Sequence, residues 1–190
     1  MNSIKSWCCI RDALGKYKIV EQLQKLEEYD TTTFSHSMRT AQFAVYVGCN
    51  VGLSDKELRT LTKAALLHDI GKIFIPKEIL TKPDKLTSEE FEIMKTHAEL
   101  GANYLEELNF NKKIVRIVRE HHENFDGTGY PSHKKYDELD KLSRILRIAD
   151  TFDAMHSERP YKNPVPSRQI YEVFHNDCSH CYDPQLIPYL

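Results

Sequence analysis

Apolar residues recur at helical spacing through most of this chain, and few residues interrupt that spacing. The 190 residues include only 7 Gly and 8 Pro, and runs with strand-like alternation are short. Because Gly and Pro interrupt helices most strongly, and half-buried strands need alternation with period two, the pattern predicts helices. We therefore expect a single all-α domain, a helical bundle whose polar side chains can project inward to form a metal site in its core.

Capping signals indicate where several helices begin. Ser54 and Glu57 form a capping-box pattern, Thr87-Ser-Glu-Glu opens a later helix, and Asp30 or the Thr after it can cap another. Residues 123–135 are rich in Gly, Asp, Asn and Pro, which predicts a loop. The expected helices cover about residues 16–28, 31–48, 55–69, 88–108, 112–122, 139–156 and 167–174.

Composition narrows the class of protein. The formal net charge of −2 gives no basic field for polymeric nucleic acid, so an anionic substrate must be held by local charge. Residues 1–18 contain no apolar run long enough for a signal peptide or a membrane span. The five cysteines are odd in number and lie in a chain without a recognisable export signal, so we expect them to be reduced thiols. We therefore expect a cytoplasmic protein.

Histidine is frequent, with nine in the chain, and several lie beside acidic residues. In the stretch LLHDIGK, an apolar helix end delivers His68 and Asp69, and Lys72 follows three residues after Asp69. Taken alone, this stretch also suits a plain helix C-terminus, where His and Lys face the helix dipole favourably. Further candidate ligands lie on other predicted helices: His36, His97, His121, His122 and Asp150. Metal ions would compensate the cost of burying all these groups together.

In this order, the motifs resemble those of HD-GYP domains, a branch of the HD phosphohydrolase superfamily. The resemblance covers about residues 31–190 and leaves residues 1–30 as an N-terminal helix and linker. A single His-Asp dipeptide would be weak support, whereas the ordered set is specific. The matching residues are His36, His68-Asp69, Gly71-Lys72, His97, His121-His122, Asp126 to Pro131, Asp150 and Arg159 to Lys162.

The resemblance implies a centre of two divalent metal ions, with Asp69 as a ligand of both. The first ion would be held by His36, His68, Asp69 and Asp150, and the second by Asp69, His97, His121 and His122. Mixed imidazole and carboxylate ligands suit iron or manganese without excluding zinc or nickel, and the family favours iron or manganese. Some members hold a third ion through a glutamate one turn before the first histidine. Thr32 stands at that position here, so we expect two ions.

The activity implied by the resemblance is phosphodiester hydrolysis of cyclic di-GMP to linear pGpG, which some members of the family cut further to GMP. The two metal ions lower the pKa of a bridging water, so that hydroxide attacks phosphorus. Asp69 and Lys72 are the expected catalytic residues, with Lys72 able to reach a phosphate oxygen or the water. The remaining candidates are expected to bind substrate: Gly129, Tyr130, Pro131, Arg159 and Lys162.

Two other functions remain open from the sequence. The chain could be a metal-retaining but inactive cyclic-dinucleotide binding or adaptor module. It could also be an HD phosphohydrolase that acts on another nucleotide, such as cyclic GMP-AMP. Residues 132–136 (SHKKY) lack the glycine that the family usually carries after the GYP motif, which leaves open both the substrate and docking to a diguanylate cyclase or regulatory-domain partner.

Overall fold

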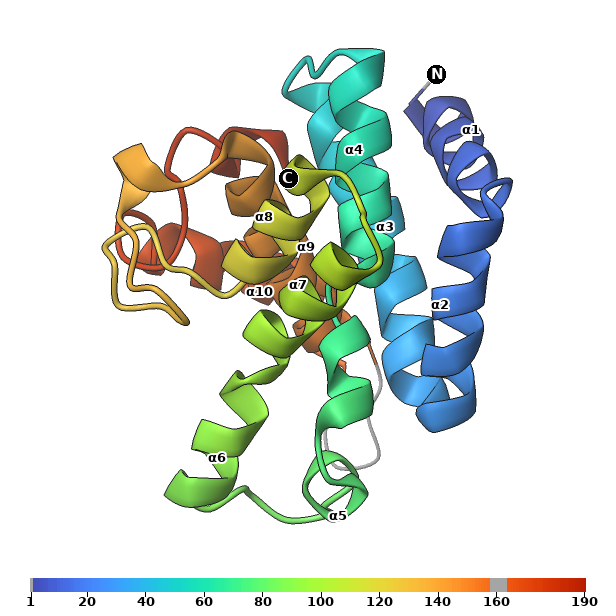
Figure 1. Ribbon diagram of the computed structural model, residues 1–190. Coiled ribbons are helices and arrows are strands. Elements are labelled where there is room, and N and C mark those ends of the chain that lie inside the picture. Colours follow the sequence, from blue (N-terminus) through green and yellow to red (C-terminus); the bar gives the residue numbers. More distant parts are fainter. Residues whose placement is uncertain (1, 158–163) are drawn as a thin grey trace.

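The structure, a computed structural model, describes residues 2–157 and 164–190. Within these ranges the chain forms helices and no strand, apart from one isolated bridge between Cys178 and Tyr182. The all-α fold expected from the sequence is therefore confirmed (Figure 1). The α-helices are α1 (Asn2–Leu14), α2 (Tyr17–Tyr29), α3 (Thr31–Asn50), α4 (Asp55–Leu67), α5 (Lys77–Leu80), α6 (Ser88–Lys95), α7 (His97–Glu107), α8 (Lys112–Glu120), α9 (Lys141–His156) and α10 (Ser167–Asn176). Short 3-10 helices are η1 (Ile70–Phe74), η2 (Tyr136–Glu138) and η3 (Ile187–Tyr189).

The predicted caps start the helices that carry the site. Asp30 accepts a hydrogen bond from Thr33 N at 2.8 Å and so caps α3. Ser54 and Glu57 form the expected capping box at the start of α4, in which Glu57 accepts from Ser54 N at 2.8 Å. These side chains satisfy backbone N–H groups that have no partner inside the helix, which fixes where each helix begins.

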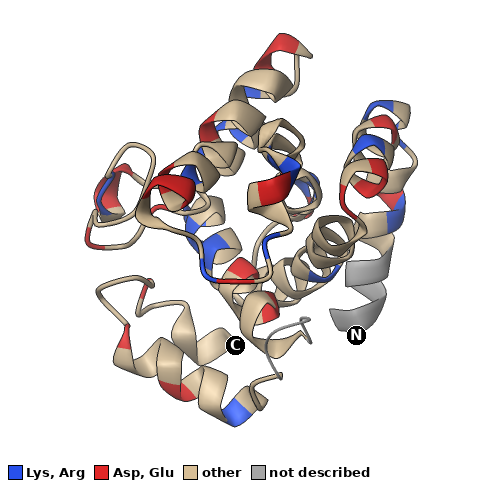
Figure 2. Ribbon diagram, turned by 90° about the horizontal axis from the view of Figure 1, so that it is seen from below, with Lys and Arg blue, Asp and Glu red and all other residues tan. Residues whose placement is uncertain are grey.

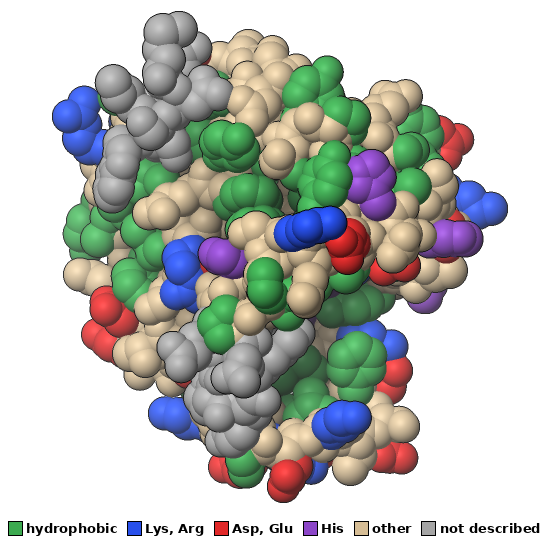
Figure 3. All heavy atoms as spheres, turned by 180° about the vertical axis from the view of Figure 1, so that it is seen from behind, with side chains coloured by type: hydrophobic (Ala, Val, Ile, Leu, Met, Phe, Trp, Pro, Cys, Tyr) green, Lys and Arg blue, Asp and Glu red, His purple; other side chains and the backbone are tan. Residues whose placement is uncertain are grey.

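Helices α3 and α4 form the centre of the bundle, with α1 and α2 packed on one side and α9 against α3 (Figure 1). The core is aliphatic and includes residues of the first thirty, such as Ile10, Ile19 and Leu26. The division of the chain at residue 30 stays a prediction. Acidic and basic residues are interspersed along the helices and loops (Figure 2), and side chains of both charges lie on the face that Figure 3 shows, in accord with the small net charge.

The single helix expected over residues 88–108 is wrong, because α6 ends at Lys95 and α7 begins at His97. The hydroxyl of Thr96 donates to Ile93 O at 2.6 Å, and such side-chain bonds to the backbone compete with helix continuation. None of the residues of α6 is buried, whereas α7 packs against η1 and α8. The break therefore lets α6 leave the bundle, next to α5, while α7 stays in it (Figure 1).

Two glycines bring η1 into direct backbone contact with α7. A Cβ atom on Gly71 would lie 2.5 Å from Gly101 N and closer still to His97 O. A Cβ atom on Gly101 would lie 2.9 Å from Gly71 N. Only residues without a side chain fit this approach. The contact holds the segment after His68 and Asp69 against the start of α7.

The loop predicted at residues 123–135 is confirmed. Its first half is fixed to the C-terminal segment, since Phe125 N donates to Cys181 O at 3.3 Å and Asp126 N donates to His180 O at 2.9 Å. None of the described helices combines the length and the apolar character needed to span a lipid bilayer.

Candidate metal centre

Five segments bring imidazoles and carboxylates together inside the bundle. His36 lies on α3, His68 and Asp69 follow α4, His97 starts α7, and Asp150 lies on α9. His121 and His122 follow the last residue of α8. All these residues are buried except His122, which is partly buried. Every candidate ligand predicted from the sequence is thus located in one place.

His36, His68 and Asp69 form the first group, which we call the His36 group and which includes Asp150. The ligand atoms of the first three residues all lie within 4.8 Å of one another. His36 Nε2 lies 3.0 Å from Asp150 Oδ1 and 3.7 Å from Asp69 Oδ2. His68 Nε2 lies 3.4 Å from the same oxygen of Asp69. One cation could therefore reach all four side chains.

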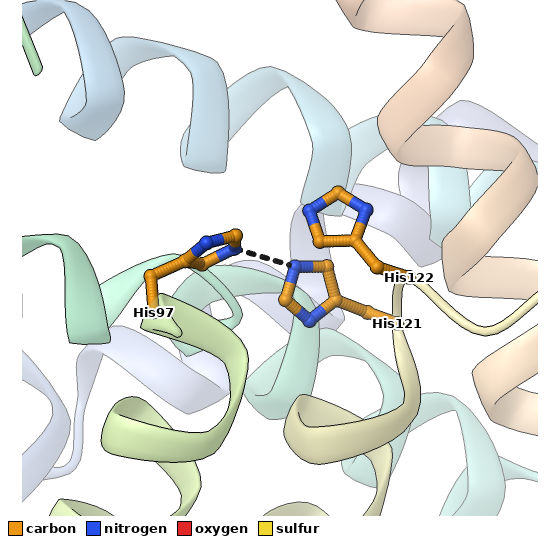
Figure 4. Close-up of side chains that lie close together, drawn as sticks. All are labelled: His97, His121 and His122. Atoms are coloured by element: carbon orange, nitrogen blue, oxygen red, sulfur yellow. Dashed lines mark hydrogen bonds between the residues drawn. The ribbon is translucent and has the colours of Figure 1, made fainter. Parts of the chain in front are cut away.

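His97, His121 and His122 form the second group, here called the His97 group. Their imidazoles point toward one another from α7 and from the end of α8 (Figure 4). The Nε2 atoms of His97 and His121 are 3.2 Å apart, and the ligand atoms of all three lie within 4.8 Å of one another. Asp69 Oδ1 lies 3.3 Å from His97 Nε2. Asp69 therefore directs one oxygen to each group.

The donor atoms fit a divalent cation. Asp69 Oδ1 and His68 Nε2 are buried and have no hydrogen-bond partner. A buried polar atom without a partner is costly, whereas a metal ion between these atoms would use their lone pairs. Imidazole nitrogens combined with carboxylate oxygens suit several divalent transition metals.

Backbone carbonyls orient three of the imidazoles. Each of these rings donates Nδ1–H to the carbonyl three residues earlier, which leaves Nε2 free to face the cluster. The three pairs are His68 with Ala65 O at 2.7 Å, His97 with Met94 O at 2.7 Å, and His121 with Val118 O at 2.6 Å.

The two groups differ in charge. Burial lowers the pKa of His97 to about 4, so this ring is neutral at pH 7. Burial also lowers the pKa of His36, but hydrogen bonds to Asp150 and Asp153 outweigh it and raise the pKa to about 9. Burial raises the pKa of Asp69, yet Lys72 and the neighbouring imidazoles hold it well below its usual value. The carboxylates are thus ionised, and His36 must lose a proton when it binds a metal.

The centre opens into a cavity of about 420 Å³. Lys72 donates to Asp69 Oδ2 at 2.7 Å, which fixes its ammonium group beside the carboxylate shared by the two groups. The ring of Tyr130 lies 4.8 Å from that of His122, centroid to centroid. Members of both groups line the cavity, namely His36, His97 and His122. Residues around them complete its lining, including Thr32, Thr33, Lys72, Lys82, Met94 and Tyr130.

The Gly129–Tyr130–Pro131 loop is packed directly on the chain that follows His122. A Cβ atom on Gly129 would lie 2.5 Å from Glu123 Cα, so only glycine fits there. Tyr130 N donates to His122 O at 3.2 Å. Arg159 and Lys162, the other expected substrate-binding residues, lie outside the described residues.

Three residues that hold parts of the centre or of the loop beside it were not predicted from the sequence: Asp153, Arg39 and Glu123. Asp153 accepts from His36 Nδ1 at 2.7 Å, and Arg39 holds Asp153 with two hydrogen bonds. The buried carboxylate of Glu123 accepts from Ser132 N at 2.6 Å and so holds the end of the Gly129–Tyr130–Pro131 loop. One signal was present in the sequence, because Asp150 and Asp153 are three residues apart and share a helix face.

Comparison with known proteins identifies the family. The family model described as "HD domain" matches residues 20–186, which is most of the chain. The chain belongs to the HD domain family. This match confirms the resemblance that the motifs indicated, since HD-GYP domains are a branch of the HD superfamily.

Curated relatives of this HD domain are cyclic-dinucleotide phosphodiesterases by name. A "Cyclic di-GMP phosphodiesterase" of Thermotoga maritima is 39% identical over 90% of this chain and 47% of the relative. A "3'3'-cGAMP-specific phosphodiesterase 3" of Vibrio cholerae is 34% identical over 93% of this chain and 37% of the relative. The chain thus spans about half or less of the length of these relatives.

Solved structures share the fold of this HD domain. A "HDG"Y"P protein" of Bdellovibrio bacteriovorus superimposes with a TM-score of 0.69 at 22% identity, over 82% of this chain and 50% of that one. The HD domain of the phosphodiesterase PgpH of L. monocytogenes gives a TM-score of 0.65 at 21% identity, over 89% of this chain and 91% of that one. At these identities the likeness concerns the fold.

Proposed function

We propose that this HD domain is a metal-dependent phosphodiesterase that hydrolyses cyclic di-GMP to linear pGpG, which the same centre could cut further to GMP. The observation that carries the proposal is the position of Asp69, whose two oxygens face two separate groups of imidazoles 3.3 and 3.4 Å away. The names of the relatives support the substrate class.

The proposed centre holds two divalent ions, with iron or manganese favoured by the family resemblance and compatible with the donor set. The His36 group with Asp150 would hold one ion, and the His97 group would hold the other, with Asp69 as their common ligand. Bound together, such ions lower the pKa of water and neutralise phosphate oxygens. Thr32 lines the cavity without a carboxylate, which supports two ions over three.

Lys72 and Asp69 are the proposed catalytic pair. The hydrogen bond of 2.7 Å from Lys72 to Asp69 Oδ2 holds a fixed positive charge at the edge of the cavity. A cation held in place before the reaction stabilises charge that builds on phosphate oxygens without a reorganisation cost. Lys72 is partly exposed, so its ammonium group can contact a substrate as well as Asp69.

Substrate binding is proposed for the Gly129–Tyr130–Pro131 loop. Tyr130 lines the cavity, and its ring offers a flat face on which a guanine base can stack. Gly129 permits the close packing that places this ring beside His122, and Pro131 stiffens the following turn. Arg159 and Lys162 are proposed to bind the second phosphate or a guanine edge, because both side chains are cations.

A second substrate is supported by the Vibrio cholerae relative, whose name specifies 3'3'-cGAMP. The two cyclic dinucleotides share their backbone and differ in one base, so the same metal centre could serve either.

Binding of a protein partner, such as a diguanylate cyclase or a regulatory domain, to the surface near the loop stays a proposal. A cytoplasmic location stays a prediction as well.

The experiment is a turnover assay on protein purified without oxygen and loaded with Mn(II) or Fe(II). Cyclic di-GMP and cyclic GMP-AMP are offered separately, and the products are separated by chromatography. The proposal predicts linear pGpG from cyclic di-GMP. Binding of cyclic di-GMP without product at any metal loading would instead identify an inactive binding module, and turnover of another nucleotide alone would identify a different phosphohydrolase.

A further inference from the structure

His36 is oriented differently from His68, His97 and His121. His68, His97 and His121 donate Nδ1–H to backbone carbonyls, which are neutral acceptors. His36 Nδ1 instead lies 2.7 Å from Asp153 Oδ2, a carboxylate. A carboxylate behind a ligating imidazole fixes its tautomer and increases the basicity of the other nitrogen. The nitrogen that faces the cluster is therefore a stronger donor in His36 than in the other three rings.

Asp153 is itself held firmly. Arg39 Nε donates to its Oδ1 at 2.7 Å and Arg39 Nη2 donates to its Oδ2 at 3.0 Å. Ser157 Oγ donates to Oδ1 at 2.8 Å. Asp153 is only 5% exposed, and a two-point arginine contact leaves its carboxylate little freedom to turn.

The arrangement follows from two pairs of residues on packed helices. His36 and Arg39 are three residues apart on α3, and Asp150 and Asp153 are three residues apart on α9, so each pair shares one helix face. Because α3 packs against α9, Asp150 meets the inner nitrogen of His36 while Asp153 meets the outer one.

The two groups of ligands are consequently unequal. The His36 group has the carboxylates of Asp69 and Asp150 beside its imidazoles, with Asp153 directly behind. The His97 group has three imidazoles, a share of Asp69, and Asp150 Oδ2 at 3.7 Å from His122 Nδ1, but among the described residues no carboxylate hydrogen-bonded behind a ring as Asp153 is behind His36. A carboxylate hydrogen-bonded behind one ring strengthens cation binding by that ring, which belongs to the His36 group.

We propose that Asp153 is a positioning residue for His36, and that Arg39 keeps it in place. By accepting Nδ1–H, Asp153 turns Nε2 of His36 toward the cluster and strengthens binding of the ion held by the His36 group. The inference rests on the proposed two-ion centre. The competing explanation is that Arg39 and Asp153 form an ion pair that merely joins α3 to α9.

A second buried ion pair provides a matched control. Arg144 Nη1 lies 2.5 Å from Asp183 Oδ2, and Asp183 is 3% exposed. This pair also joins α9 to a neighbouring segment, but neither residue is hydrogen-bonded to a histidine of the centre. Asp183→Asn therefore removes a comparable buried charge without touching the proposed orientation of His36.

The test measures binding of two Mn(II) ions to the wild type and to three variants, Asp153→Asn, Arg39→Gln and Asp183→Asn. Thermal unfolding of each variant is recorded alongside. Asp153→Asn is expected to bind one ion about 10- to 100-fold more weakly and the other unchanged. Arg39→Gln, whose side chain is half exposed and therefore tolerant of change, should weaken the same ion by a smaller factor. Asp183→Asn should bind both ions as the wild type does, even where its Tm falls.

A second readout follows the tautomer of His36 directly. Long-range ¹⁵N–¹H NMR spectra of zinc-loaded protein should show the proton on Nδ1 in the wild type, and a second population or a shifted Nδ1 resonance in Asp153→Asn. Unchanged affinity for both ions in Asp153→Asn, or an equal loss in Asp183→Asn, would overturn the positioning role. Absence of ion binding by the wild type would instead overturn the proposed function.

Discussion

Substitution of Gly71 by alanine tests whether the backbone contact between η1 and α7 supports the metal centre. The added Cβ would lie 2.5 Å from Gly101 N and 2.9 Å from Gly101 Cα, and closer still to His97 O. All three atoms belong to the backbone, so a side-chain rotation cannot relieve the overlap. The helix η1 must therefore move away from α7, and with it Asp69 must move away from His97.

The expected cost can be estimated from this geometry. Adding one methyl group to a tightly packed interior costs about 1–3 kcal/mol, and overlap with rigid backbone favours the upper end. For a chain of this size, about 3 kcal/mol corresponds to a decrease in Tm of roughly 6–12 °C. Since Asp69 is the proposed common ligand, the affinity for both ions should fall as well.

Gly48→Ala is the matched control. Its Cβ would meet side-chain atoms, with Leu53 and Leu58 both at 3.0 Å, and these flexible ends can give way. Alanine also favours the helix by about 1 kcal/mol over glycine, which offsets the crowding. Differential scanning calorimetry measures the Tm of both variants, and titration with Mn(II) measures their affinity for the ions. Should Gly71→Ala unfold within 2 °C of the wild type and bind both ions normally, the proposed role of this contact is refuted.

Three further predictions concern the loop, the lysine and pH. Gly129→Ala should raise the KM for substrate at least tenfold, because the new Cβ overlaps the backbone of His122, Glu123 and Asn124 and displaces Tyr130. An unchanged KM would contradict this. Lys72→Gln should reduce kcat about 100-fold or more and leave Mn(II) stoichiometry unchanged, which a steady-state assay with parallel metal analysis checks. The pKa of metal-free His36 is raised to about 9, so protons compete with the metal for this ring below that pH. Calorimetric titration with Mn(II) between pH 6 and 8 should therefore show the metal affinity rising with pH, by up to about tenfold per pH unit. A metal affinity that does not change with pH would disprove the competition.

The helices could be predicted because their signals are local. Capping residues such as Ser54 and Glu57 act within one turn, so the sequence marks the start of α4 without knowledge of its neighbours. The break at Thr96 could not be predicted in this way. It depends on α7 packing against η1 and α8 while α6 packs little, which is a property of the assembled bundle.

The ligands were predicted because each histidine or acid belongs to a recognisable motif in a fixed order. The residues that support them were not, because a contact such as that of Asp153 with His36 joins positions 117 residues apart. Gly71 belongs to a recognised motif, but the motif does not explain why a glycine is needed there. The structural reason is the backbone of α7, which lies directly against Gly71. Supporting contacts of this kind depend on tertiary packing, which spacing along the chain does not encode.

The most direct test of the centre is the number of metal ions bound per chain in the wild type and in Asp69→Ala. Both proteins are purified without oxygen, loaded with Mn(II), desalted and analysed by mass spectrometry for metal content. Because Asp69 faces both groups of imidazoles, the wild type should retain two ions per chain and the variant none. Two ions retained by the folded variant would contradict a centre built around this carboxylate.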